Sequence, residues 1–166
     1  MRSSPSWWAS KARQFRAHLR ASVAPAERAE LEAWTTAAQR AVFDGMHVAD
    51  RRHGLDVVAA LRAEGVTDGE VLVAGLLHDA GKGETGVLPR VVYALGDRYG
   101  TWIVRAAAVV PGWRAALERL RVHAETSAAM AAEAGCSPRT VELIRHQDAP
   151  TDPEYGELLR LADEAN

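Results

Sequence analysis

The chain lacks most features that would point to an extracellular or membrane protein. Its single cysteine, Cys136, excludes an internal disulfide and is typical of a reducing compartment. It has no run of about 18 apolar residues, so no membrane span is expected. The N-terminus lacks the uninterrupted apolar segment of a secretory signal. We therefore expect a cytoplasmic protein.

An excess of one charge and strand-like patterns are also lacking. The formal net charge is only −2, so the composition gives no reason to expect nucleic acid as a partner. Alternating runs of β-branched residues do not occur, whereas Ala, Leu, Arg and Glu recur at helical spacing. A length of 166 residues suits one domain with a sizeable core. We predict an all-α, single-domain protein.

Caps, glycines and prolines define the expected helices. Pro25 suits the first turn of one helix, Gly65 ends another, and Asp68 and Ser137 suit N-caps. The predicted helices cover approximately residues 6–20, 25–34, 37–46, 49–64, 68–79, 89–97, 100–109, 111–121, 123–134, 138–148 and 153–166.

The first 26 residues differ in composition from the rest. They contain five Lys or Arg residues, no acid, and the pair Trp7 and Trp8. Such a helix can bind an anionic membrane surface or nucleic acid. The favoured alternative is that its apolar side chains dock on the protein. We predict that residues 1–40 form a helical extension packed on a domain of residues 41–166.

The most informative segment is residues 76–82 (LLHDAGK), in which an apolar run ends in His78 and Asp79. Helical spacing directs both side chains toward apolar sides of their helix. Burying an imidazole beside a carboxylate is costly unless a partner satisfies both groups. A divalent ion is the simplest partner of this kind.

Two further polar residues fall on apolar helix faces. His53 shares a stripe with Ala49 and Val57, and Asp163 shares a face with Leu159. A lone histidine in such a position is usually a core residue, but unpaired buried carboxylates are too costly to be structural filler. Either arginines or a cation must neutralise them. Two imidazoles and two carboxylates suit Mn, Fe, Ni, Co or Zn.

The order of these residues, H…HD…D, and the sequence of residues 76–82 resemble the HD-domain superfamily of metal-dependent phosphohydrolases. Residues 43–57, 135–146 (GCSPRTVELIRH) and 158–166 (LLRLADEAN) are similar to segments of a group of small bacterial HD-domain proteins. The resemblance covers roughly residues 10–166 and implies an HD-domain helical bundle.

Two intervening histidines bear on the number of ions. Superfamily members with two further histidines hold two ions bridged by the motif aspartate, and members without them hold one. His123 looks like the family's HPE helix start, and His146 looks like its I..HH segment, with Gln147 in place of the second histidine. The alternative is that His123 caps its helix and His146 lies at the surface beside Arg145. The resemblance favours two ions, and Gln147 argues against a third. The implied ligand set is His53, His78, Asp79, His123, His146 and Asp163.

The resemblance also implies the reaction. It would be the hydrolysis of a phosphomonoester or phosphodiester, in a nucleotide or other small phosphorylated metabolite, by a metal-activated water. Asp79 would hold the ions and orient the nucleophile. Lys82, three residues later, would stabilise charge on the phosphoryl group, unless it is a solvated loop lysine. Substrate specificity is expected in residues 83–121.

Two other functions fit the same residues. Some superfamily members use a mixed-valent di-iron pair to activate oxygen, held by four histidines and two aspartates, which this chain also supplies. A non-catalytic module that binds a nucleotide is the third possibility, and the complete ligand set argues against it. The sequence does not define an oligomeric state.

Overall fold

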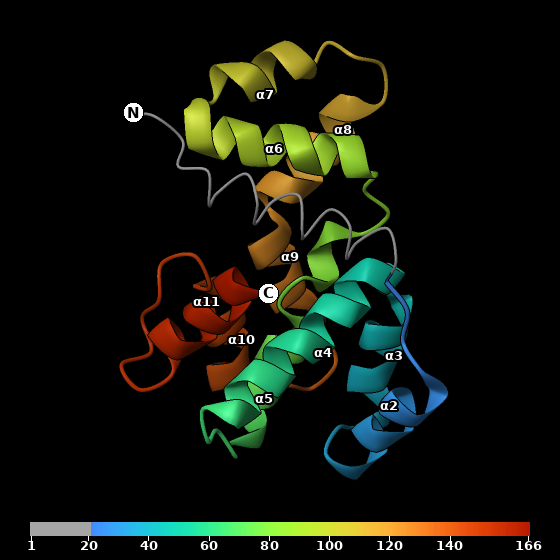
Figure 1. The fold of residues 1–166 in the computed structure, drawn as a ribbon, viewed down its shortest axis with the longest axis vertical. Coiled ribbons are helices and arrows are strands. Elements are labelled where there is room, and N and C mark those ends of the chain that lie inside the picture. The colour runs from blue at the N-terminus through green and yellow to red at the C-terminus, as the bar shows by residue number, and fades with distance from the viewer. Residues whose placement is uncertain (1–20) are drawn as a thin grey trace.

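The computed structural model describes residues 21–166, and every regular element in this range is a helix (Figure 1). The predicted all-α class is confirmed for this part of the chain. The helix predicted over residues 6–20 lies outside it. In chain order the elements are α2 (Pro25–Glu30), η1 (Leu31–Ala33), α3 (Ala37–Gly45), α4 (Val48–Ala63), α5 (Gly69–Leu77), η2 (Ala80–Lys82), α6 (Val87–Tyr99), α7 (Trp102–Ala107), α8 (Trp113–Arg121), α9 (His123–Glu133), α10 (Pro138–Arg145) and α11 (Gly156–Ala165).

Capping side chains define several helix starts. The predicted caps Asp68 and Ser137 are confirmed, since each side-chain oxygen accepts a backbone N–H from the first turn of α5 or α10. Thr36 caps α3 in the same way. These bonds satisfy donors that a helix start leaves without partners. They explain why the sequence predicts these boundaries well.

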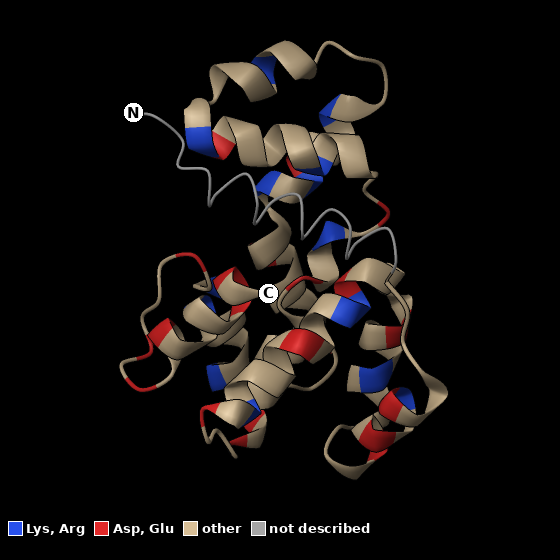
Figure 2. Ribbon diagram, in the orientation of Figure 1, with Lys and Arg blue, Asp and Glu red and all other residues tan. Residues whose placement is uncertain are grey.

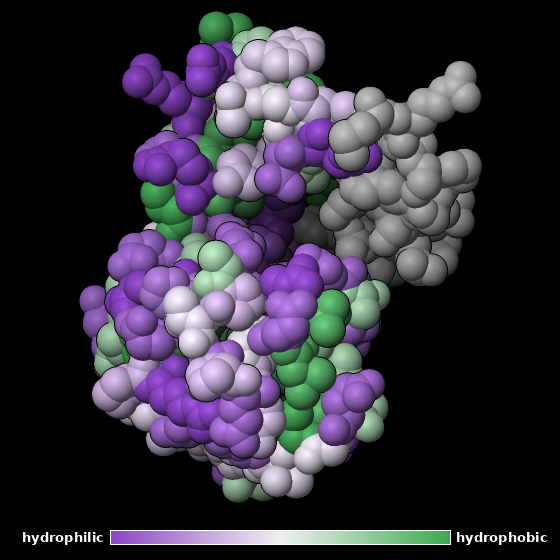
Figure 3. Space-filling model, turned by 90° about the vertical axis from the view of Figure 1, so that its left-hand side faces the viewer, coloured by the Kyte–Doolittle hydropathy of each residue, from purple (hydrophilic) through white to green (hydrophobic). Residues whose placement is uncertain are grey.

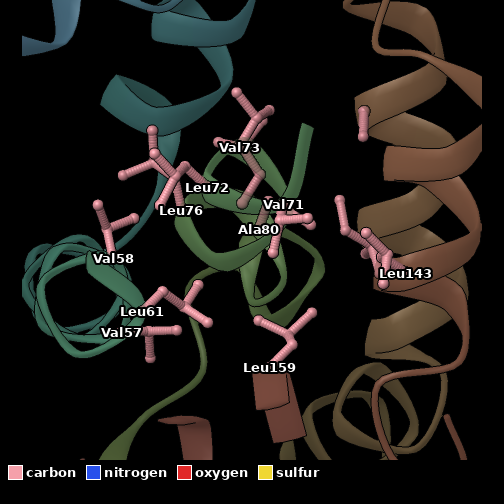
Figure 4. Close-up of a cluster of buried hydrophobic side chains, with 14 of the residues drawn as sticks. Val57, Val58, Leu61, Val71, Leu72, Val73, Leu76, Ala80, Leu143 and Leu159 are labelled. Atoms are coloured by element: carbon pink, nitrogen blue, oxygen red, sulfur yellow. The ribbon is translucent and has the colours of Figure 1, made fainter. Parts of the chain in front are cut away.

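Helix α5 forms the centre of the core. Its residues 71–77 are all buried. Figure 4 shows Val57 and Leu61 of α4 and Leu159 of α11 gathered around it. A helix that is apolar on every side must be covered on every side. The polar residues that follow α5 are therefore held inside the bundle.

Helices α6–α8 form a layer that projects at one end of the long axis (Figure 1). Residues 87–121 contain six arginines and only two acids, whereas acidic side chains are frequent in the larger body (Figure 2). Leu88, Trp102 and Val109 of this layer are exposed. Figure 3 shows a hollow with hydrophilic walls between the layer and the body. In Figure 1, η2 and α9 lie at the height of this hollow.

The structure differs from the sequence prediction at the last two helices. Helix α10 ends at Arg145, so the predicted continuation to residue 148 is wrong. Helix α11 begins at Gly156 rather than at residue 153. The reason is that the Asp152 carboxylate accepts hydrogen bonds from two following backbone N–H groups and forms a turn before the helix.

One hydrophobic core is shared by the described elements outside the α6–α8 layer. Leu31, ahead of the predicted boundary at residue 40, and Phe43, after it, are both buried in this core. The division into an extension over residues 1–40 and a domain over residues 41–166 stays a prediction. Within residues 21–166, no helix is long and apolar enough to cross a membrane.

Candidate metal centre

The candidate centre is built where α5 ends. His78 is the C-cap of α5 and Asp79 the N-cap of η2, and each residue is only 2% exposed. Because α5 is covered on all sides, its C-terminal end places both polar groups in the interior. An imidazole and a carboxylate buried together need partners from the surrounding helices.

On one side, α4 approaches α5 through a backbone contact at Gly54. A Cβ at this position would lie 2.5 Å from the Leu76 carbonyl oxygen, so the approach requires glycine. The contact brings the His53 and His78 rings edge to face, with centroids 5.1 Å apart. Helix α11 adds Asp163, whose Oδ1 lies 2.7 Å from His53 Nε2.

On the other side, η2 approaches α9 through a second glycine. A Cβ at Gly81 would lie 2.4 Å from the His123 carbonyl oxygen, and the Gly81 N–H donates to Ser127 Oγ at 2.8 Å. This contact places His123 Nε2 3.7 Å from Asp79 Oδ1. Asp79 therefore lies between two groups of side chains contributed by different helices.

His78 contains a buried nitrogen without a partner. Its Nδ1 lies 2.9 Å from the Gly75 carbonyl oxygen, which can only accept, so Nδ1 carries the proton. Nε2 has no hydrogen-bond partner, although Oδ1 of Asp163 and Oδ1 of Asp79 lie 3.3 and 3.5 Å away. A buried nitrogen facing two carboxylate oxygens needs a proton or a metal cation.

The separations between these atoms suit a single ion. Donor atoms bound to one ion at about 2.1 Å lie no more than about 4.2 Å apart. His53 Nε2 lies 2.7 Å from Asp163 Oδ1 and 3.9 Å from Asp79 Oδ2, and the two distances from His78 Nε2 are also within this limit. The donors of His53, His78 and Asp163 all lie within 4.8 Å of one another, which exceeds this limit by about 0.6 Å at most. Mixed nitrogen and oxygen donors suit the transition metals expected from the sequence.

Charges in the cluster favour a cation. Burial alone would lower the pKa of His78, but the carboxylates of Asp79 and Asp163 raise that pKa to about 9. Burial alone would raise the pKa of either acid. The pKa of Asp79 is nevertheless held far below its ordinary value by the charges of His78 and Lys82, and that of Asp163 by its hydrogen bond with His53 and by the charge of His78. The two acids therefore remain charged and attract positive charge to His78 Nε2.

Lys82 is paired inside the centre. Its Nζ lies 2.5 Å from Asp79 Oδ2. Burial would lower the pKa of Lys82, but the Asp79 charge outweighs burial and raises it. The Thr85 hydroxyl donates to the Lys82 carbonyl oxygen at 2.7 Å, which holds the loop that follows. Lys82 is therefore an ion-paired residue and not a solvated loop lysine.

A second buried ion pair supports the same loop. Arg90 donates to both oxygens of Asp50, at 2.6 and 2.7 Å, and its Nε donates to the Thr85 carbonyl oxygen at 2.9 Å. Neither Asp50 nor Arg90 was predicted to support the site, because they are 40 positions apart in the chain. The sequence nevertheless contains an indication for Asp50. It lies three residues before His53, so the two side chains project from nearly the same face of α4.

His123 reaches the centre together with Gln147. His123 Nδ1 lies 2.7 Å from the Leu120 carbonyl oxygen, so it carries the proton, and Nε2 lies 3.0 Å from Gln147 Nε2. Burial and the charge of Lys82 lower the pKa of His123. Gln147 is 6% exposed, and its Oε1 has no hydrogen-bond partner. Its contact with His123 was not predicted, because the sequence marks Gln147 only as a departure from the family pattern.

His146 has a different partner. Its Nε2 lies 3.2 Å from Oε2 of Glu142 on the same helix, and its side chain is 37% exposed. Unlike His53, His78 and His123, it has no ring nitrogen within 4.0 Å of an Asp79 carboxylate oxygen. Five of the six predicted ligands thus come together, namely His53, His78, Asp79, His123 and Asp163.

Comparison of the chain with protein-family models, curated proteins and solved structures found no match. The resemblance to the HD-domain superfamily therefore stays a prediction.

Proposed function

We propose that this chain is a metal-dependent phosphohydrolase with an HD-domain bundle. Its divalent ion would bind between His53, His78, Asp79 and Asp163. The observation that carries the proposal is the buried Nε2 of His78, which has no hydrogen-bond partner and faces two carboxylate oxygens. Structural ion pairs are usually completed by hydrogen bonds, whereas this nitrogen is left as a donor for a metal.

The residues of the chain would divide the work of holding the ion. His78 would bind through Nε2, because its Nδ1 is already hydrogen-bonded to Gly75. His53 Nε2 lies 2.7 Å from Asp163 Oδ1 and would lose its proton when the ion binds, so that both atoms become ligands. When bound, the ion would supply a water of lowered pKa and withdraw charge from a phosphoryl oxygen.

Lys82 is the feature that favours an anionic substrate. Its ammonium group is held at Asp79 Oδ2, next to the candidate ion position, and its side chain is 23% exposed. Hydrolysis of a phosphate ester increases charge on the phosphoryl oxygens, and a fixed cation stabilises that charge. The substrate would be a phosphomonoester or phosphodiester, in a nucleotide or another small phosphorylated metabolite.

The test begins with protein stripped of metal by a chelator and reloaded separately with Mn²⁺, Fe²⁺, Co²⁺, Ni²⁺ or Zn²⁺. A panel of nucleotide and sugar monoesters and diesters is then assayed for phosphate release. We expect hydrolysis only with bound metal, and neither metal nor hydrolysis in Asp79→Ala. Asp97→Ala, at an exposed position of α6, is the matched control and should leave both unchanged.

Two results would contradict this function. Wild-type protein that binds none of the five ions would remove its basis. An iron-loaded protein that consumes oxygen and hydrolyses no phosphate ester would instead support the di-iron alternative.

A further inference from the structure

We infer that Gln147 closes the position at which a second ion would bind beside Asp79, so that the centre holds a single ion. This inference rests on the proposed metal site. It concerns the side of Asp79 that faces α9, where the sequence resemblance implies a second ion bound by His123 and His146. The structure brings Gln147, and not His146, to this side.

A second ion would need the lone pair of His123 Nε2, and this lone pair already accepts a hydrogen bond. Because His123 Nδ1 carries the proton that it donates to Leu120, Nε2 is the atom available to a metal. The Gln147 amide donates to this atom at 3.0 Å. The reverse orientation of the amide would face its oxygen with the His123 lone pair, which is unfavourable unless an ion lies between them.

The burial of Gln147 makes the contact persistent. Gln147 follows the last turn of α10 and is 6% exposed. Water therefore cannot readily replace its amide as the hydrogen-bond partner of His123. Its Oε1 is left without a partner, a cost that an ordinary surface glutamine would avoid. The hydrogen bond from the Gln147 amide to His123 offsets part of this cost.

Few donors remain for a second ion. Lys82 occupies Asp79 Oδ2, and Asp79 Oδ1 lies 3.5 Å from His78 Nε2 and so belongs also to the first ion position. His146 is paired with Glu142. One shared carboxylate oxygen does not make a transition-metal site, which normally takes about four to six donors.

A single-ion centre has a chemical consequence. Oxygen activation by a mixed-valent di-iron pair requires two metals and the six-residue ligand set that includes His146. Hydrolysis by one ion, with Lys82 as the second positive charge, requires only the residues already gathered at Asp79. Gln147 thus selects, within the proposed metal site, for hydrolysis.

The experiment counts ions in the full-length chain. Stripped protein is titrated with Co²⁺, the bound metal is measured by elemental analysis after removal of excess, and the visible Co²⁺ spectrum is recorded. We expect one Co²⁺ per chain in wild type. We expect two in Gln147→His, because the new imidazole and the released His123 Nε2 provide two nitrogen donors beside Asp79. Gln147→Leu, which has similar bulk and no donor, is the matched control and should bind one.

The outcomes separate this inference from the proposed function. Two ions in wild type would overturn the inference and leave the metal site intact. One ion in a folded Gln147→His protein, with a thermal unfolding curve like that of wild type, would also overturn it. If that variant does not fold, Gln147→Glu supplies a carboxylate of nearly unchanged size, and the same two-ion count is expected. No ion in wild type would overturn the metal site and the inference together.

Discussion

Two groups of side chains meet at Asp79, and they differ in the atoms they leave unpaired. The carboxylate side, defined as His53, His78 and Asp163, leaves a buried imidazole nitrogen facing two acid oxygens. The lysine side, defined as Lys82, His123 and Gln147, pairs its histidine nitrogen with an amide and carries a positive charge. One side attracts a cation, whereas the other already supplies one.

The two sides nevertheless use the same packing device. On the carboxylate side, Gly54 lets α4 contact the backbone of α5, and on the lysine side Gly81 lets η2 contact the backbone of α9. Each glycine lies within two residues of a side chain at the centre. The difference between the sides therefore arises from the polar residues presented, not from how closely the helices pack.

The largest expected effect is a contrast between Asp163→Ala and His123→Ala. Asp163→Ala should remove stoichiometric metal and all turnover, because it takes away one of the two acids that face His78 Nε2. Loss of an outer partner alone typically costs about 10–100-fold in metal affinity, so loss of a direct ligand should exceed this. His123→Ala should retain one ion. Metal titration of both variants measures the contrast, and equal loss in the two would show that the sides do not differ.

Lys82→Ala should have the next largest effect, and on rate rather than on metal. The ion count should stay at that of wild type, because Lys82 is not a donor to the ion. Hydrolysis should slow by roughly 10²–10³, the scale expected when one charge-stabilising donor is lost. The decrease should be mainly in kcat, because the negative charge on the phosphoryl oxygens that Lys82 stabilises increases in the transition state. Lys82→Arg should recover part of the rate, and full activity in Lys82→Ala would remove the lysine from the mechanism.

The packing contacts predict a smaller, structural effect. Gly54→Ala and Gly81→Ala should each lower the free energy of unfolding by about 1–3 kcal/mol, because the added methyl overlaps backbone atoms of a neighbouring element. Gly54→Ala should also weaken metal binding, since it displaces His53. Gly45→Ala is the matched control, because nothing lies within 4 Å of its added Cβ. Denaturant unfolding with and without metal compares the three, and no difference between them would mean that the close approaches are not required.

Most of the fold could be predicted because its signals are local. Apolar periodicity and single capping residues such as Asp68 and Ser137 act within a few positions, and the structure confirms these caps. The start of α11 was missed because the Asp152 turn competes with the helix over only three residues. The layered arrangement of α6–α8 could not be predicted, since it depends on contacts between distant segments.

The site divides in the same way. His78 and Asp79 could be predicted because an imidazole and an acid at the end of an apolar run are chemically conspicuous. The pairing of Gln147 with His123 could not, because amide side chains carry no charge and the partners are 24 positions apart. For His146, residue type and order match the pattern, but the choice between Glu142 and Asp79 depends on where α10 ends.

The smallest expected effect is that of His146→Ala, which tests where the lysine side ends. The His146 side chain is 37% exposed and its contact is with Glu142, four residues earlier on the same face of α10. Exposed pairs with this spacing contribute about 0.3–0.5 kcal/mol, so unfolding should change by no more than that. Glu142→Ala removes this contact and also the ion pair between Glu142 and Arg145, so it should destabilise slightly more. Metal analysis should give the wild-type ion count in both variants, because neither residue contacts Asp79. A lower count in His146→Ala, but not in Glu142→Ala, would mean that His146 leaves Glu142 and joins His123 when metal binds, and the contrast between the two sides of the centre would no longer hold.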